Sequence, residues 1–186
     1  MSEQSSIRII GGKWRSRKVI FESKDTLRPT PDRVRETLFN WLAPHLPGAV
    51  CLDLYAGSGV LSLEALSRGA KAATTVDIDR ANIINMEQNR EKLQANEMSI
   101  VHKNVLDMLA QKPMVADIAF VGPPYKLRLL KTTFELLENN DWLHANSFIY
   151  FDQDEPLDPD SLPATWSIWR QSKAGRVYFY LAIKER

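Results

Sequence analysis

An alternation of apolar runs and helix-like segments fills the chain from residue 49 to residue 151. The runs with β-strand character lie at residues 49–55, 71–78, 98–103, 116–121 and 147–151. The segments with helical spacing lie at residues 61–68, 80–95, from Val105 onward, and 127–138. Strands separated by helices of this length require crossover connections, which give a parallel sheet covered on both faces. The sequence therefore predicts an α/β fold.

The end of the chain departs from this pattern. Two β runs at residues 165–172 and 175–183 follow each other with no helix between them, which predicts an antiparallel hairpin. Added to a parallel sheet, the hairpin gives a seven-stranded mixed sheet. Dehydrogenase domains usually close with further parallel units. A terminal antiparallel pair instead resembles the Rossmann-like class I fold of the S-adenosylmethionine-dependent methyltransferases.

Composition narrows the class of protein further. A chain of 186 residues that is 44% hydrophobic has enough material for one buried core without disulfide support. Its only cysteine, Cys51, cannot form an internal bridge, and no Cys/His cluster has the spacing of a zinc site, so no metal is expected. The sequence shows neither a secretory signal nor an apolar run long enough to span a membrane. We therefore expect a cytoplasmic protein with no membrane partner.

Positive charge is concentrated near the N-terminus. Between Ile7 and Arg35 nine basic residues occur with three acidic ones, although the formal net charge of the chain is only +1. Two β runs around a Gly-Gly turn predict a basic hairpin arm within residues 1–29, followed by a main domain at residues 30–186. Such an arm on a neutral body is suited to contact with a polyanion. A solvated surface hairpin with no binding role is the alternative.

A helix is predicted to start after the hairpin, because Thr30 can cap free amide groups and Pro31 fits the first helical position. Apolar residues then recur at helical spacing, at Val34, Leu38, Trp41 and Leu42.

A glycine-containing loop follows the first predicted parallel strand and opens a helix. It reads Asp53-Leu54-Tyr55-Ala56-Gly57-Ser58-Gly59. In a doubly wound sheet this place, at the carboxyl edge of the strands, binds nucleotide-like ligands. A dinucleotide fingerprint would have a third glycine where Ser62 stands, and Asp53 favours a cationic ligand such as S-adenosylmethionine over a pyrophosphate. The alternative is a turn with no ligand, in which glycine relieves backbone strain and Asp53 caps the helix.

The next two strand ends supply further candidates for cofactor contact. Asp77 ends the second parallel strand, 18 residues beyond Gly59, where an acid can accept hydrogen bonds from ribose hydroxyls. Asp79 is expected to cap the following helix. Asn104 and the backbone amide of Val105, after the third strand, are expected to contact the adenine edge.

The fourth strand is followed by Gly122-Pro123-Pro124-Tyr125. Enzymes that methylate amino groups carry Asp/Asn-Pro-Pro-Tyr/Phe at this place. An exocyclic amine conjugated to a base is a poor nucleophile, and acceptors for its N–H groups orient its lone pair and stabilise the positive charge of attack. Gly122 lacks the acceptor side chain. Losing one preorganised polar group costs roughly 100- to 1,000-fold in rate, so the sequence predicts impaired activity.

The chain resembles the RsmD family, bacterial methyltransferases that modify a guanine N2 in 16S ribosomal RNA of the small ribosomal subunit. The resemblance rests on the segments RIIGGKWRSRK, LRPTPDRVRETLFNWL, DLYAGSG, VGPPY and KAGRVYFYL. It implies a monomer that uses S-adenosylmethionine and acts on the small subunit or its RNA.

The resemblance also implies roles for three sets of residues. The expected cofactor-binding residues are Asp53, Tyr55, Ala56, Gly57, Ser58, Gly59, Asp77, Ile78, Asn104 and Val105. The expected catalytic segment is Gly122, Pro123, Pro124 and Tyr125, with the tyrosine stacking on the base. The expected RNA contacts are Arg8, Lys13, Trp14, Arg15, Arg17, Lys18, Arg28, Thr30, Asp32 and Arg33. For Trp14 the alternative is packing within the hairpin, and for the last four it is helix capping and a local Arg/Asp pair.

Other functions remain open at this point. A ribosome-assembly or RNA-binding factor that kept the fold and lost catalysis would also carry Gly122. An adenine-N6 DNA methyltransferase would use the same Pro-Pro-Tyr motif to bind an exocyclic amine, but the chain has no segment left for a separate target-recognition domain.

Overall fold

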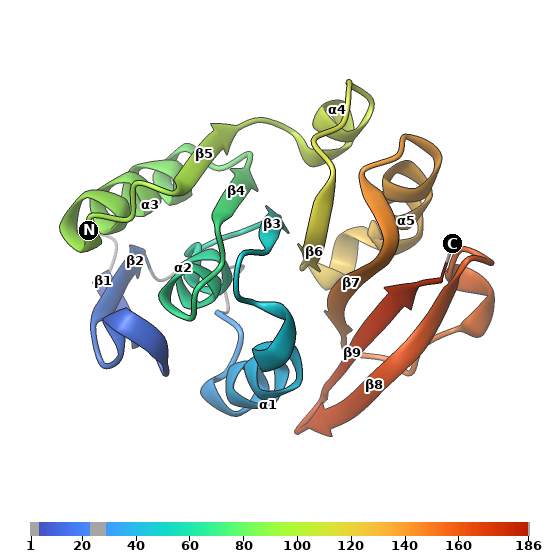
Figure 1. The fold of residues 1–186 in the computed structure, drawn as a ribbon, viewed down its shortest axis with the longest axis horizontal. Helices are drawn as coiled ribbons and strands as arrows, with labels where there is room; N and C mark the ends of the chain where they lie inside the picture. The colour runs from blue at the N-terminus through green and yellow to red at the C-terminus, as the bar shows by residue number, and fades with distance from the viewer. Residues whose placement is uncertain (1–3, 23–28, 186) are drawn as a thin grey trace.

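The computed structural model describes residues 4–22 and 29–185 (Figure 1). The strands are β1 (Gln4–Arg8), β2 (Lys18–Glu22), β3 (Val50–Leu54), β4 (Ala72–Asp77), β5 (Met98–His102), β6 (Ala116–Val121), β7 (Leu143–Gln153), β8 (Trp166–Ala174) and β9 (Val177–Lys184). The α-helices are α1 (Asp32–Leu42), α2 (Val60–Ser67), α3 (Arg80–Leu93), α4 (Val105–Leu109) and α5 (Leu130–Asn139). Short 3-10 turns lie at η1 (Gly12–Trp14), η2 (Ala43–His45), η3 (Tyr125–Leu127) and η4 (Pro159–Ser161).

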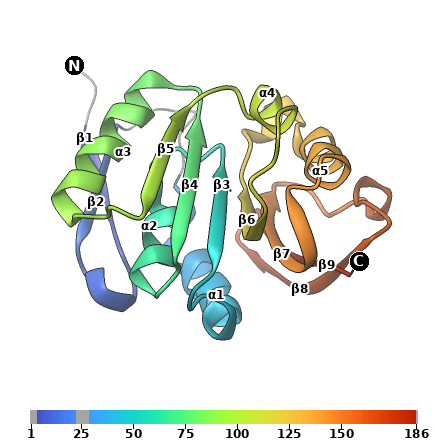
Figure 2. The same cartoon turned by 45° about the horizontal axis from the view of Figure 1, so that its top comes forward.

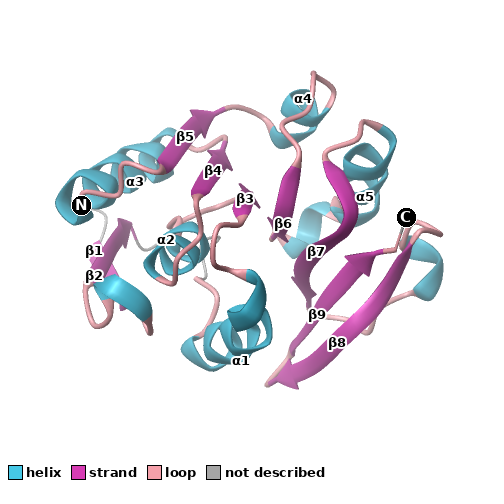
Figure 3. Cartoon of the chain, viewed as in Figure 1, coloured by secondary structure: helices cyan, strands magenta, loops and turns pink. Residues whose placement is uncertain are grey.

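The main sheet has seven strands in the order β5-β4-β3-β6-β7-β9-β8 (Figures 2 and 3). Strands β3 to β7 pair in parallel, whereas β9 pairs antiparallel with both β7 and β8. The mixed sheet with a terminal antiparallel hairpin, predicted from the sequence, is confirmed.

Helices pack on both faces of the sheet. Neighbouring residues of a strand point to opposite faces, so each strand contributes side chains to both helix layers. Phe120 on β6 belongs to a cluster with α1, α2 and α3, through residues such as Leu38, Leu63 and Met86. The next residue, Val121, belongs to a second cluster, with residues of α4 and α5. The carboxyl edge of the sheet is thus held between two packed layers.

The N-terminal hairpin packs on the same core. Strands β1 and β2 pair antiparallel as predicted, and Ile9, Trp14 and Val19 are buried in the cluster of α1, α2 and α3. Asn89 of α3 fastens β2 through two hydrogen bonds with the backbone of Ile20, of 2.9 and 2.7 Å. Residues 4–22 therefore share a core with the rest of the chain, and the predicted boundary at residue 29 does not separate two cores.

A buried ion pair joins the hairpin, α1 and α2. Arg35 and Glu64 are both 0% exposed, and their side chains are 3.2 Å apart. Arg35 also donates to the carbonyl oxygens of Arg8 and Thr30, while Glu64 accepts from the backbone amides at the turn of the hairpin, at residues 10 and 11. The cost of burying both charges is offset by these added hydrogen bonds.

The start of α1 differs from the prediction. The helix begins at Asp32 with Pro31 at the N-cap, and Thr30 makes no capping bond. The Thr30 carbonyl accepts from the guanidinium of Arg35, and the Thr30 side chain hydrogen-bonds with Tyr150, whose pKa is raised chiefly by burial. The side chain that the local pattern assigned to a cap is thus bound to a residue on β7.

Within residues 4–22 and 29–185, none of the helices combines the length and apolar character required to cross a membrane. The same residues hold no cluster of three metal-ligating side chains.

Candidate active site

The candidate site lies at the carboxyl edge of the parallel strands, where the segments that follow five neighbouring strands meet. These segments are residues 55–59 after β3, 78–79 after β4, 103–105 after β5, 122–125 after β6, and the end of β7 at residues 152–153.

The loop after β3 turns sharply through left-handed backbone. Tyr55, Gly57 and Gly59 have φ values of 60°, 58° and 72°. A Cβ on Gly59 would lie 2.9 Å from the sulfur of Met86 in α3, so glycine permits both the backbone angle and the close approach of α3. This geometry leaves the loop backbone at the edge of the sheet, where a ligand can contact it.

Asp53 lies beneath the loop. Its side chain is 2% exposed, and Oδ2 accepts hydrogen bonds from the amide and hydroxyl of Ser62, at 3.2 and 2.8 Å. Burial raises the pKa of Asp53 to about 7. Because it accepts from the Ser62 amide, the carboxyl caps the first turn of α2, which is the structural role that the sequence offered as the alternative to ligand binding. Direct contact of Asp53 with a ligand cation stays a prediction.

Asp77 fixes the loop to the end of β4. Its Oδ2 accepts from the amide of Gly57 at 2.8 Å, and its Oδ1 accepts from the amide of Asp79 at 2.8 Å. Oδ1 also accepts from the side-chain amide of Asn82 at 3.3 Å, so it is Oδ2 that can accept a further bond, for example from a ribose hydroxyl. Ile78 beside it is 63% exposed and offers an apolar surface to an adenine ring. These residues fit an adenosyl group. Asp79 caps α3 as predicted.

Asn104 is the N-cap of α4, since its Oδ1 accepts from the amides of Leu106 and Asp107 at 2.9 and 3.4 Å. Its predicted contact with adenine therefore depends on the side-chain nitrogen, together with the amide of Val105. His102 ends β5, and its Nε2 lies 2.9 Å from the carbonyl oxygen of Ile78, which links β5 to the loop after β4.

The segment after β6 lies beside the glycine loop. The amide of Gly122 donates to the carbonyl oxygen of Leu54 at 3.3 Å, which continues the β3–β6 ladder to the edge of the sheet. Gly122 is exposed, and a Cβ built on it would meet no heavy atom within 4 Å among the described residues. A side chain at this position therefore has room.

Tyr125 and Asp152 form the polar centre of this part of the site. The hydroxyl of Tyr125 donates to Oδ1 of Asp152 at 2.9 Å, and the buried Tyr150 donates to Oδ2 at 2.6 Å. Burial raises the pKa of Asp152, which is 9% exposed. Sequence reasoning missed Asp152. Its place directly after the apolar run at 147–151, on the same edge as the other candidates, was the available signal.

The five basic residues of the hairpin that were expected to contact RNA are exposed. These are Arg8, Lys13, Arg15, Arg17 and Lys18. Trp14 is 8% exposed and packs in the core, so the packing alternative holds and we remove Trp14 from the expected RNA contacts. The ammonium of Lys13 lies 4.4 Å from the centre of its ring.

The segment around α1 is only partly as expected. Arg28 lies outside the described residues. Asp32 pairs with the buried Arg35, which realises the local Arg/Asp pair, while Arg33 is exposed on α1 and Thr30 is half-buried. Sequence reasoning also missed a group of exposed basic residues directly after the Pro-Pro-Tyr segment: Lys126, Arg128 and Lys131.

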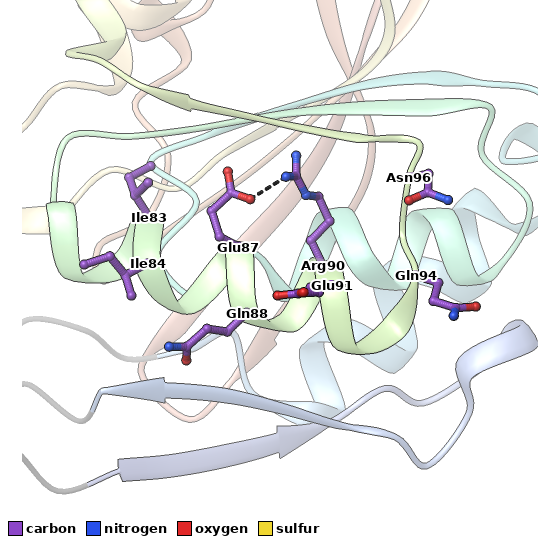
Figure 4. A pocket seen from close by; sticks show the side chains of 8 residues that line it. All are labelled: Ile83, Ile84, Glu87, Gln88, Arg90, Glu91, Gln94 and Asn96. Atoms are coloured by element: carbon purple, nitrogen blue, oxygen red, sulfur yellow. Dashed lines mark ion pairs between the residues drawn. The ribbon is translucent and has the colours of Figure 1, made fainter.

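A hollow on the described surface lies elsewhere, along α3 (Figure 4). It is lined by residues between Ile83 and Asn96 and includes the surface ion pair of Arg90 with Glu87. It contains none of the residues at the carboxyl edge.

The strand order, the terminal antiparallel pair and the glycine loop define a Rossmann-like class I S-adenosylmethionine-dependent methyltransferase. Within this class, residues 7–183 match the model of the family described as "Conserved hypothetical protein 95". The chain belongs to this family of methyltransferases.

Named relatives agree with the family. The Escherichia coli K12 "Ribosomal RNA small subunit methyltransferase D" is 46% identical over 184 residues, which cover 99% of this chain and 93% of that protein. The protein of the same name from Buchnera aphidicola (Acyrthosiphon pisum) is 38% identical, with 97% and 95% covered. A solved Escherichia coli structure, called methyltransferase yhhF, is 47% identical and superposes with a TM-score of 0.87, covering 97% of this chain and 99% of that one.

Proposed function

We propose that the protein transfers a methyl group from S-adenosylmethionine to the exocyclic N2 of a guanine in 16S ribosomal RNA of the small ribosomal subunit. The observation that carries the proposal is the hydrogen bond between Gly122 and Leu54, because it holds the Pro-Pro-Tyr segment against the glycine loop. Methyl donor and acceptor base would therefore meet at one place on the sheet edge. The named relatives supply the ribosomal RNA substrate class.

Each part of the site has a role in this reaction. S-adenosylmethionine supplies an electrophilic methyl: the N2 lone pair forms the N–C bond, the S–C electron pair stays on sulfur, and N2 then loses one proton to water. Asp77 and Ile78 bind the adenosyl part, through ribose hydroxyls and the adenine face. The carbonyl of Pro123 accepts from the amine, and the ring of Tyr125, 37% exposed, stacks on a base presented out of its helix.

The basic hairpin binds RNA phosphates. Its five basic residues are exposed whereas Trp14 lies in the core, so charge, and not intercalation, provides the contact. The exposed Lys126, Arg128 and Lys131, which closely follow Tyr125 in the chain, add positive charge near the base-binding segment.

The test is transfer of labelled methyl to small subunits that lack the modification, for the wild-type protein and for Gly122→Asp. Digestion to nucleosides identifies the product. Label in N2-methylguanosine with the wild-type protein supports the proposal, and label in N6-methyladenine or in duplex DNA contradicts it. If only Gly122→Asp transfers label, the scaffold is a methyltransferase whose natural form has lost its acceptor.

A non-catalytic RNA-binding or ribosome-assembly factor is the second candidate. The observation that favours it is the missing side chain at Gly122, which removes an acceptor although the site has room for one. This function predicts that the wild-type protein and Gly122→Asp both bind S-adenosylmethionine and small subunits, and that neither yields product at long times.

A further inference from the structure

Asp152, the last residue but one of β7, lies beside Gly122. The parallel register pairs Phe120 with Tyr150 and Val121 with Phe151, so the next residues in line are Gly122 and Asp152. Neighbouring strands lie about 4.8 Å apart. A side chain at residue 122 and the side chain of Asp152 would therefore be cross-strand neighbours.

The carboxylate of Asp152 points to the same face of the sheet as a side chain at residue 122 would. Side chains two residues apart on a strand share a face. Phe120 and Tyr150 both belong to the cluster of α1, α2 and α3, so residues 122 and 152 share that face beyond them. A Cβ on Gly122 would contact nothing within 4 Å among the described residues, so this face has room for a ligand group beside Gly122.

The carboxylate is held in place by donors that leave its charge unpaired. Two tyrosine hydroxyls bind it, one to each oxygen, and none of the ion pairs within residues 4–22 and 29–185 includes it. Each oxygen can accept one more hydrogen bond. A fixed carboxylate without a counter-ion stabilises positive charge that develops on a nearby amine.

We propose that Asp152 accepts a hydrogen bond from the exocyclic amine of the target base, in the role that an Asp or Asn at residue 122 has in other amino-methylating enzymes. The neighbouring strand thus supplies the acceptor that Gly122 lacks. The inference rests on the proposed function, and it assigns the activity of the natural protein to a residue outside the Pro-Pro-Tyr segment.

The test compares single-turnover methyl transfer to small subunits for the wild-type protein, Asp152→Ala, Gly122→Asp and the double variant Gly122→Asp/Asp152→Ala. Cofactor binding is measured by calorimetry, and folding by thermal melting. Asp154→Ala is the matched control, because this exposed carboxylate lies just beyond β7. If Asp152→Ala does not fold, Asp152→Leu, which also lacks an acceptor and is close to Asp in size, replaces it in both backgrounds.

We expect Asp152→Ala to lower the transfer rate about 100-fold or more with cofactor affinity unchanged, as for loss of one preorganised polar group. The double variant should recover to within about tenfold of the wild-type rate, because the carboxylate introduced at residue 122 restores an acceptor at the same place. Asp154→Ala should match the wild-type protein.

Two outcomes would overturn the inference while leaving the proposed function intact: Asp152→Ala retains the wild-type rate, or the double variant stays as slow as Asp152→Ala. A wild-type protein that is inactive while Gly122→Asp is active would contradict both the inference and the proposed activity of the natural protein, and would leave only a methyltransferase scaffold. In a Tyr125→Phe background, loss of the Asp152→Ala effect would show that Asp152 acts by orienting Tyr125, which also contradicts the proposal. Inactivity of both the wild-type protein and Gly122→Asp would instead mean that the proposed function has failed, and the inference with it.

Discussion

The amide of Gly57 donates a 2.8 Å hydrogen bond to Oδ2 of Asp77, so the glycine loop after β3 is fixed to the end of β4. The same carboxylate holds the amide of Asp79 at the start of α3. One side chain thereby orders two of the loops at the carboxyl edge, and it is also the predicted ribose acceptor.

Replacing Asp77 with Ala should weaken S-adenosylmethionine binding by roughly 10- to 100-fold, because hydrogen bonds to a charged group contribute about 1.5–3 kcal/mol. Calorimetric titration with S-adenosylmethionine measures this change. The exposed Asp107, on α4, provides the control variant Asp107→Ala. Equal affinity for Asp77→Ala and the wild-type protein would remove Asp77 from the cofactor site.

Asp53 should make the stability of the protein depend on pH. Its folded-state pKa of about 7 lies above the usual 3.8, so the folded protein binds more protons than the unfolded chain between these values. Wild-type stability is therefore expected to fall, relative to Asp53→Asn, as pH rises from about 4 to 7, by an amount on the order of a few kcal/mol. Urea unfolding of both proteins at pH 5 and pH 7 tests this. A difference between the two proteins that does not change with pH would contradict it.

Glu64→Gln should destabilise the fold by about 3–5 kcal/mol, because it removes the buried counter-ion of Arg35 and leaves that guanidinium with Asp32 alone. The hairpin should loosen as well, since Glu64 accepts from its turn, and faster hydrogen exchange of the backbone amides at residues 10 and 11 reports that change. Glu87→Gln is the matched control. It breaks the exposed pair with Arg90 and should cost less than about 1 kcal/mol. Equal urea midpoints for the two variants would show that the buried pair is not a major source of stability.

Neutralising Arg15 and Arg17 together should reduce the salt dependence of RNA binding. Each lost phosphate contact lowers the slope of log K against log salt by about 0.7–0.9. Binding to small-subunit RNA over a range of salt concentrations gives the slope. Lys112→Ala, in the loop between α4 and β6, should leave the slope unchanged.

Trp14→Phe should lower the stability of the protein and leave its RNA affinity unaltered. A large loss of RNA affinity at unchanged stability would return Trp14 to the RNA-binding surface.

Glycine substitutions at two places should differ in their effect on stability. Gly59→Ala forces a side chain into left-handed backbone and against Met86, so it should destabilise the protein and weaken cofactor binding. Gly122→Ala has open space, and we expect its free energy of unfolding to stay within about 1 kcal/mol of the wild-type value. Thermal melting of the two variants side by side decides the point. A large loss of stability for Gly122→Ala would show that glycine at 122 is required by the fold.

Much of the architecture could be read before the structure was known. The alternation between residues 49 and 151 gives five of the strands, and the uninterrupted β runs after residue 165 give the antiparallel end. The cap of α3 at Asp79 was also predictable, because capping involves neighbours in sequence. Thr30 failed as a cap because its side chain bonds in the folded chain with Tyr150, which is distant in sequence.

The sequence by itself determined the α/β class, the mixed sheet and the segments that carry the candidate chemistry, because these depend on periodicity and turn chemistry over short stretches. The tertiary structure alone decided that Trp14 lies in the core and that Glu64 anchors the hairpin. It also decided that Asp152 lies beside Gly122 and accepts a hydrogen bond from Tyr125. The reason is physical: helix packing, strand order and register bring together residues that are 27 to 54 positions apart in sequence, and no local pattern encodes that arrangement.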